Sequence, residues 1–356
     1  MELFPPLFLL NSLLIFFTPS SAFRVFRISD YSENVINAGS KVAQTITVDK
    51  SGHEAFKTIQ AAIDSIPSEN TQWVLVQINP GIYIEKVSIP VDKPFVFLKG
   101  IGGRTQTTVT FDGHDQTDTS STFSSFADNV VVQGITFKNS FNLAAALNFE
   151  DEITNGVNVV KPALAARIYG DKSAFFESGF VGLQDTLFDV QGRHYFKTCY
   201  IEGAIDFIFG SGQSFYEDTL INVTVEALPS PIRVGFITAQ GRSSSNDPSG
   251  FVFKGGLVFG SGQVQLGRAY GPYSRVIFYG TNLGAVVAPQ GWDAWRQKGH
   301  EGNIMYAEVN CKGQGSDTTK RVAWEKKMST SDLNKYYSKS SFVDQDLWIS
   351  KLPETM

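Results

Sequence analysis

Two aspartates stand among apolar residues in the stretch GLQDTLFDVQGRHYFKTCYIEGAIDFIFG, residues 182–210. Asp185 follows a Leu-Gln pair, and Asp206 lies between an isoleucine and a phenylalanine. A buried carboxylate is costly unless a partner compensates it. Two carboxylates held close together separate their pKa values, which would create an acid beside a nucleophile or base. The alternative is a pair of structural aspartates in the turns of a repetitive β fold.

The elements around these aspartates repeat at a fixed period. An aromatic residue, a few polar or small residues, an apolar pair and a turn residue recur from Phe175, Tyr195 and Phe215, at steps of 20 residues. Further copies begin at Phe251 and Val276. Such a period is typical of a stacked solenoid, and each unit is too short for a crossover helix. The pattern predicts an all-β parallel β-helix, with a β-sandwich as the alternative.

In a β-helix, residues one coil apart lie one strand spacing apart, about 4.8 Å. Asp185 and Asp206 are 206 − 185 = 21 residues apart, which is one coil to within a residue. We therefore expect the two carboxylates on neighbouring strands of one face, where one pKa rises and the other stays low.

The flanking segments predict caps on the solenoid. Phe56, Ile59, Ile63 and Ile66 follow helical spacing, and Pro67 ends this short N-terminal helix. The lysine-rich residues 321–337 predict a C-terminal helical segment that covers the last strands.

The N-terminus resembles a secretory signal over residues 1–22. Its apolar run is too short to span a bilayer, and Ser20 and Ala22 supply the small residues of a cleavage site. A polar lead-in over residues 23–44 and a β-helix domain over residues 45–350 follow. We expect a secreted, extracellular protein whose mature form has no membrane segment. The net charge of −5 argues against a nucleic-acid partner.

Cysteine and histidine usage favours neither a disulfide framework nor a metal site. Cys199 and Cys311 are interpreted as two buried thiols, with a single bridge as the alternative. The four histidines lack partners at metal-ligand spacing, so no metal is expected, and His194 is interpreted as structural. Asn222 begins the one N-glycosylation sequon.

Five ordered motifs carry a family resemblance. GLQDTL, YIEGAIDFIFG and LGRAYGPYSRV are preceded by GIYIE and followed by GWDAW. From about residue 45 to about residue 345 the chain resembles a plant-type pectin methylesterase (pectinesterase, carbohydrate esterase family 8). The resemblance implies a right-handed parallel β-helix that hydrolyses the methyl esters of homogalacturonan, releases methanol and needs no cofactor. Its implied partners are methylated homogalacturonan and a proteinaceous pectinesterase inhibitor, and a monomer is expected.

The resemblance also implies roles for the catalytic residues. Asp206 matches the nucleophile, and Asp185 matches the general acid that later acts as base. Gln184 matches an amide donor to the oxyanion. Arg268 matches the arginine that keeps the nucleophile ionised and oriented, as an arginine beside a carboxylate does.

The substrate-binding residues implied by the resemblance are mostly aromatic. Tyr270 and Trp292 would flank the scissile sugar, with Phe207 nearby. Ser140 stands where the family usually has a threonine that contacts substrate.

Two departures from the family pattern leave a second function open. The family's QAVALR motif reads PALAAR here, so an oxyanion glutamine is replaced by Pro162, and the usual tryptophan after the arginine is Tyr270. Losing one oxyanion donor costs about 10²–10³ in rate. The alternative is therefore a catalytically weakened pectin-binding wall protein. A glycoside hydrolase on the same fold is a third hypothesis, because paired carboxylates alone permit it.

Overall fold

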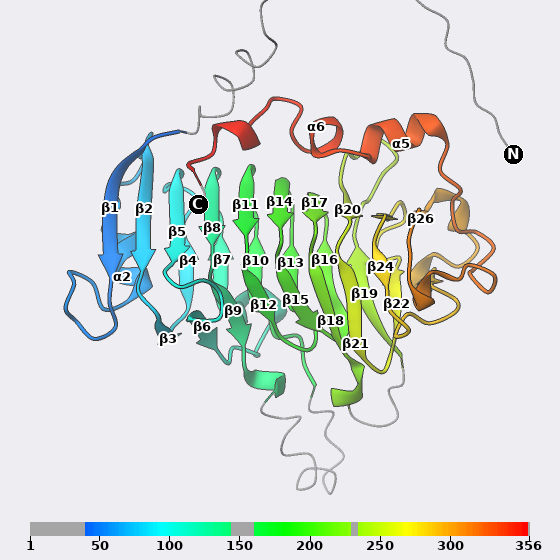
Figure 1. Cartoon of the computed structure of the whole chain (residues 1–356), viewed down its shortest axis with the longest axis horizontal. Helices are drawn as coiled ribbons and strands as arrows, with labels where there is room; N and C mark the ends of the chain where they lie inside the picture. The colour runs from blue at the N-terminus through cyan, green and yellow to red at the C-terminus, as the bar shows by residue number, and fades with distance from the viewer. Residues whose placement is uncertain (1–39, 144–159, 229–233, 355–356) are drawn as a thin grey trace, which may run out of the picture. The chain divides into compact units, whose positions relative to one another are not determined.

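The computed structural model describes residues 40–143, 160–228 and 234–354. The expected signal segment 1–22 and residues 23–39 of the lead-in lie outside this part. The described chain winds through three sheets of parallel strands, visiting them in the order A, B, C on each coil (Figure 1). This arrangement confirms the predicted parallel β-helix and excludes the β-sandwich.

The strands of each sheet follow one another along the solenoid axis. Sheet A contains β1 (Val42–Val48), β2 (Trp73–Ile78), β5 (Val96–Gly100), β8 (Val130–Gln133), β11 (Ser173–Phe176), β14 (Arg193–Lys197), β17 (Gln213–Glu217), β20 (Gly250–Lys254), β23 (Arg275–Tyr279) and β26 (Met305–Val309). Sheet B contains β3 (Gly81–Ile84), β6 (Thr107–Phe111), β9 (Thr136–Asn139), β12 (Gly179–Val181), β15 (Tyr200–Gly203), β18 (Leu220–Thr224), β21 (Leu257–Ser261) and β24 (Asn282–Leu283). Sheet C contains β4 (Val87–Ile89), β7 (Phe123–Ser125), β10 (Ala166–Ile168), β13 (Leu187–Asp189), β16 (Ile205–Gly210), β19 (Val234–Gln240), β22 (Gln263–Arg268) and β25 (Trp292–Asp293).

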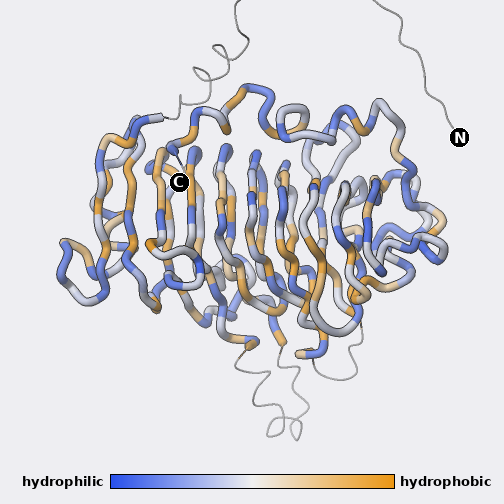
Figure 2. Tube along the Cα trace, in the orientation of Figure 1, coloured by the Kyte–Doolittle hydropathy of each residue, from blue (hydrophilic) through white to orange (hydrophobic). Residues whose placement is uncertain are grey.

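The first three repeated aromatic phrases lie on neighbouring strands of sheet A, and the first begins one residue later in the register than the next two. Phe175 pairs with Phe196, and Phe196 pairs with Tyr216, so each phrase forms the same part of successive coils. Their rings stack inside the solenoid, and the ladder continues through Phe253 to Phe278 with centroids 4.5–4.9 Å apart. Apolar residues alternate with polar ones along the strands, which places the core between the three sheets (Figure 2).

The chain turns from sheet A into sheet B with a recurrent backbone conformation. The residue after each sheet A strand from β8 to β26 adopts a positive φ. This left-handed conformation is easiest for glycine, and asparagine and aspartate tolerate it better than most residues. The column comprises Gly134, Glu177, Thr198, Asp218, Gly255, Gly280 and Asn310.

A short helix covers the N-terminal coils, as predicted. Helix α2 (Ile59–Asp64) packs against β1, β2 and β4. The Thr58 side chain accepts a hydrogen bond from Ala61 N, and the Glu85 carboxylate accepts from Ile59 N and Gln60 N. These contacts satisfy amide groups that a helix N-terminus leaves unpaired.

The C-terminal segment lies along the outer face of sheet A rather than over the last strands alone (Figure 1). Helices α5 (Thr330–Tyr336) and α6 (Lys339–Phe342) each begin with a capping box. Phe342, Val343, Trp348 and Leu352 join an outward-facing apolar row of sheet A. Short 3₁₀ helices complete the fold: η1 (Thr117–Thr119), η3 (Val225–Ala227), η4 (Trp295–Gln297), η5 (Glu301–Asn303), η6 (Gln314–Ser316) and η7 (Ile349–Lys351).

The two cysteines are unbridged, in agreement with the interpretation as thiols. Cys199 is buried and Cys311 is half-buried. Strand register places them four coils apart, about 19 Å, which is far beyond the reach of a disulfide. No helix among the described residues combines the length and apolar character needed to cross a membrane.

Candidate active site

Asp185 and Asp206 lie side by side where the chain enters sheet C. A bridge between Gln184 and Ile205, together with the pairing of Leu187 with Ile208, gives both coils the same 21-residue register. The Asp185 amide donates to the Ile205 carbonyl at 3.0 Å. Neighbouring strands are about 4.8 Å apart, so the predicted juxtaposition of the two carboxylates is confirmed.

An irregularity in the ladder accompanies Asp206. Ile205 pairs with Phe236 and Ile208 pairs with Thr238, so Asp206 and Phe207 together oppose the single residue Ile237. Such a bulge redirects a side chain at the edge of regular pairing. Phe207 is fully buried in the core, while Asp206 keeps 8 % of its surface exposed. The expectation that Phe207 lines the binding groove is therefore wrong, because its ring packs inside the solenoid.

Arg268 clamps the Asp206 carboxylate from the end of β22. Its Nε donates to Asp206 Oδ1 at 2.8 Å, and its Nη2 donates to Oδ2. The Arg268 Cζ lies 4.3 Å from the Phe236 ring centroid and 4.1 Å from that of Trp295. A guanidinium held by aromatic faces and bonded through two nitrogens is fixed in orientation, which a lysine could not reproduce.

The two carboxyl groups have different electrostatic surroundings. Burial raises the pKa of Asp185 to about 7, the Asp206 carboxylate adds to this rise, and the more distant Arg268 opposes it. Burial also raises the pKa of Asp206, but the hydrogen bonds and charge of Arg268, together with the charge of Arg296, act in the opposite direction. The pKa of both carboxyl groups is raised, and the contact with Arg268 favours the charged form at Asp206.

Gln184 directly precedes Asp185 where the chain enters sheet C. Gln184 is half-buried, and its side chain makes no hydrogen bond within the described part of the chain. On the preceding coil the Ala163 amide donates to the Gln184 carbonyl at 3.3 Å, which places the half-buried Pro162 beside the same turn. Gln184 is thus the side-chain amide available to a ligand here, and Pro162 adds no donor.

Of the predicted aromatic residues, Tyr270 is exposed and Trp292 is not. Tyr270 is 51 % exposed, with its ring centroid 5.7 Å from that of Trp295. Trp292 is only 1 % exposed and packs on Tyr306, with ring centroids 4.6 Å apart. The expectation that Trp292 flanks a sugar is wrong, because its place on β25 directs its ring into the core. Trp295, three residues later, reaches the Arg268 guanidinium instead.

Sequence reasoning also missed two phenylalanines on the outer face of sheet C. Phe188 and Phe209 are half-buried and stacked, with ring centroids 4.3 Å apart. Each lies three residues after one of the two aspartates. The repeated Asp-x-x-Phe spacing was the signal that could have identified them, because it places two rings on neighbouring coils beside the carboxylates.

The remaining predicted residues lie outside the carboxylate cluster. Ser140 follows β9, half-buried, and its hydroxyl donates to the Phe111 carbonyl at 3.3 Å. Asn222 lies on β18, and its Nδ2 donates to Tyr200 Oη and Glu202 Oε2, both at 2.9 Å. A glycan on Asn222 would disrupt both bonds. His194 is fully buried against Asp189 and the Gly170 carbonyl, in agreement with a structural role.

Comparisons with known proteins agree with this fold. The pectinesterase family model matches residues 45–346. The chain is 45% identical over 316 residues to "Putative pectinesterase 10" of Arabidopsis thaliana, covering 89% of this chain and 90% of that protein. The structure of pectin methylesterase from carrot superposes with a TM-score of 0.78 at 25% identity, covering 89% of this chain and 99% of that one. A pectin methylesterase in complex with a hexasaccharide shares the fold, with a TM-score of 0.71 at 21% identity over 86% of this chain and 98% of that one.

The fold and the site together define a right-handed parallel β-helix enzyme with a clamped pair of aspartates. The chain belongs to the pectinesterase family and is a carboxylic ester hydrolase of the plant pectin methylesterase type.

Proposed function

We propose that this protein hydrolyses the methyl esters of homogalacturonan with Asp206 as nucleophile and Asp185 as general acid and base. The observation that carries the proposal is the asymmetric pair: Arg268 holds Asp206 charged, and the neighbouring Asp185 retains its proton up to a pKa of about 7. Membership of the pectinesterase family supports the reaction class. The hexasaccharide complex of a structural relative supports a carbohydrate polymer as the substrate.

In the first half-reaction, an Asp206 oxygen attacks the ester carbonyl carbon and forms a tetrahedral intermediate. The Gln184 amide donates a hydrogen bond to the developing oxyanion. The C–O bond to the methoxy group breaks as Asp185 donates its proton, so methanol leaves and a mixed anhydride joins Asp206 to the sugar carboxyl.

In the second half-reaction, the ionised Asp185 takes a proton from water, and the resulting hydroxide attacks the anhydride carbonyl. The bond to Asp206 breaks, Asp185 is protonated again, and the galacturonic acid carboxyl is released and loses its proton to solvent. Arg268 stays bonded to Asp206 and stabilises the carboxylate at the start and the end of the cycle.

The aromatic rings with exposed surface near the carboxylates indicate which residues line the substrate groove. Tyr270, Trp295, Phe188 and Phe209 would contact sugar faces next to the carboxylates, and Ser140 would contribute a hydroxyl from the turn between sheets B and C. We further propose that the protein is secreted to the cell wall, acts as a monomer and is controlled by a proteinaceous pectinesterase inhibitor.

Methanol release from methylated pectin by the purified protein tests the proposal. Asp206→Ala, which removes the nucleophile and leaves Asp185 in place, should lose nearly all activity. Equal methanol release by the two preparations would refute the enzyme mechanism. New reducing ends without methanol would instead support the glycoside hydrolase hypothesis, because that reaction cleaves the polymer and leaves its esters intact.

A second candidate function, a pectin-binding wall protein with weak activity, is favoured by Pro162. This residue occupies the place of a glutamine in the family pattern and contributes no side-chain donor. Pro162→Gln should raise kcat by about tenfold or more if the missing donor limits turnover, because one oxyanion donor is worth about 10²–10³. An unchanged kcat would show that Gln184 alone suffices. Retained pectin binding without methanol release in the wild type would establish the binding protein.

A further inference from the structure

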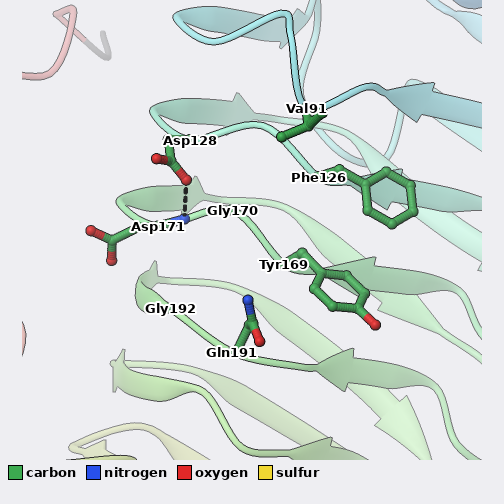
Figure 3. Close-up of a pocket in the computed structure, with 8 residues that line it drawn as sticks. All are labelled: Val91, Phe126, Asp128, Tyr169, Gly170, Asp171, Gln191 and Gly192. Atoms are coloured by element: carbon green, nitrogen blue, oxygen red, sulfur yellow. Dashed lines mark hydrogen bonds between the residues drawn. The ribbon is translucent and has the colours of Figure 1, made fainter.

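A hollow lies where successive coils turn from sheet C into sheet A (Figure 3). Its volume is about 410 Å³. Phe126 and Tyr169 follow the sheet C strands β7 and β10, and their stacked rings have centroids 5.4 Å apart. Asp128 and Asp171 stand on the opposite side of the hollow, before β8 and β11 (Figure 3). Val91 and Gln191 complete the lining.

The hollow is connected to the carboxylate site by a strip of aromatic rings. β7, β10, β13 and β16 are consecutive neighbours in sheet C, so the strand of Tyr169 is two spacings, about 10 Å, from that of Asp206. Phe209 stacks on Phe188, and Arg167 bridges onward, with its Cζ 5.8 Å from the Phe188 ring and 4.8 Å from the Tyr169 ring. A polymer laid across the strands from the carboxylates would therefore cross these rings and enter the hollow.

The lining favours a sugar residue without charge. Two ring faces suit the apolar face of a pyranose, while the Gln191 amide and the carboxylate oxygens can bond hydroxyl groups. Both charged side chains of the lining are acidic, and the cationic Arg167, which lies against both rings, is paired with Asp118 at 3.5 Å. Arg193 neutralises Asp171 through three hydrogen bonds, whereas Asp128 forms no ion pair within the described residues. A second carboxylate brought into the hollow would be repelled by Asp128.

We propose that this hollow is a distal subsite that binds a methyl-esterified galacturonate residue of the polymer being hydrolysed. The proposal rests on the proposed function, because it takes the substrate to be homogalacturonan. It assigns to Tyr169 and Phe126 the stacking platform and to Asp128 the discrimination against residues that have already lost their methyl group. The subsite would thus detect the methylation state of the substrate away from the bond being cleaved.

Substrates of two lengths distinguish a defect in this subsite from a defect in the catalytic centre. We expect Tyr169→Ala to raise KM for a fully methylated octagalacturonide by about fivefold to tenfold, the range typical of truncating an anchoring ring. Its kcat, and its kcat/KM on a methylated trigalacturonide too short to reach the hollow, should remain those of the wild type. Tyr169→Phe, which keeps the ring, should behave as the wild type on both substrates.

Tyr337→Ala is the control, because it removes a 49 % exposed tyrosine ring that belongs to the C-terminal segment on sheet A, away from the hollow. An unchanged octamer KM in Tyr169→Ala would overturn the subsite and leave the proposed function standing. Absence of methanol from both substrates in the wild type would overturn the proposed function itself. Loss of trimer activity in Tyr169→Ala would also overturn the subsite, since the ring would then act on the catalytic centre.

Charge selectivity is tested by Asp128→Asn, which keeps an oxygen to accept the Asp171 amide at 2.7 Å. The wild type should favour a fully methylated octamer over a half-methylated one in kcat/KM, and the variant should reduce that ratio about threefold to fivefold, the effect of one partly screened charge. An unchanged ratio would overturn the assignment to an esterified residue.

Discussion

At the scale of single residues, two aspartates with the same backbone setting have become chemically different. Both follow the same turn on neighbouring coils, yet only Asp206 is bonded by Arg268. Burial raises the pKa of both carboxyl groups, and Arg268 opposes this rise through hydrogen bonds and charge at Asp206 but through charge alone at Asp185. A single arginine reaching across from β22 therefore decides which carboxyl keeps the proton.

This difference predicts the pH dependence of catalysis. Asp185 must be protonated to expel methanol, so kcat/KM should fall about tenfold for each pH unit above a pKa of about 7. Asp206 must be ionised, so activity should also fall at low pH. A kcat/KM profile measured from acidic to alkaline pH would show both decreases, the acidic limb from Asp206 and the alkaline limb from Asp185. A profile that stays flat through pH 8 would show that Asp185 is not the acid.

Replacing the clamp should move the acidic limb of that profile. Arg268→Lys keeps a positive charge but loses the two-nitrogen contact and the stacking on Phe236 and Trp295. Because Arg268 lowers the pKa of Asp206, its replacement should shift the acidic limb to higher pH and reduce kcat. An acidic limb that stays in place would assign that ionisation to another group.

The buried Asp185 should also lower stability at neutral and alkaline pH. A pKa that is higher in the folded state than in the unfolded state stabilises the fold only while the group is protonated, and this contribution disappears as pH rises through about 7. Asp185→Asn should therefore raise the free energy of unfolding at pH 8 more than at pH 4. One pKa unit corresponds to about 1.4 kcal/mol, so the difference between the gains at pH 8 and pH 4 has an upper bound of about 4 kcal/mol. Thermal unfolding of the wild type and the variant at pH 4 and pH 8 would measure this difference. Equal gains in stability at the two pH values would contradict a raised pKa of Asp185.

At the scale of elements, the coil period was readable from the sequence, whereas the direction of individual side chains was not. The 20-residue spacing of the aromatic phrases predicted the solenoid, and the 21-residue separation predicted the carboxylate pair. Trp292 and Trp295 could not be told apart, because the short strand β25 and the turn into η4 decide which ring faces inward. Phe207 was misplaced because the bulge at Asp206 interrupts simple alternation.

The internal ring ladder should contribute far more to stability than the outer ring pair. Phe196 is fully buried between Phe175 and Tyr216, so Phe196→Ala should cost about 3–5 kcal/mol in the free energy of unfolding. Phe209→Ala removes a half-buried ring from the proposed groove, and it should cost less than about 2 kcal/mol while impairing activity more. Denaturant unfolding measures the stability of the two variants, and methanol release measures their activity. Equal stability losses would mean that the ladder is not the main core.

At the scale of the whole molecule, the charge balance opposes the product. The chain carries a net charge of −5, and demethylation turns pectin into a polyanion. Repulsion between like charges weakens as salt shortens the screening length. Affinity for polygalacturonate should therefore rise with added NaCl or Ca²⁺, as measured by retention on the immobilised polymer. A steady fall with salt would instead indicate a local cationic site that dominates binding.

The left-handed backbone at the two aspartates determines which residues could replace them without disturbing the fold. Asp185 and Asp206 have φ values of 59° and 49°, a region that asparagine and glycine occupy as readily as aspartate. Either carboxylate could therefore be lost to one of these residues without refolding the coil. One such substitution would therefore leave a pectin-binding protein with its groove intact and without esterase activity.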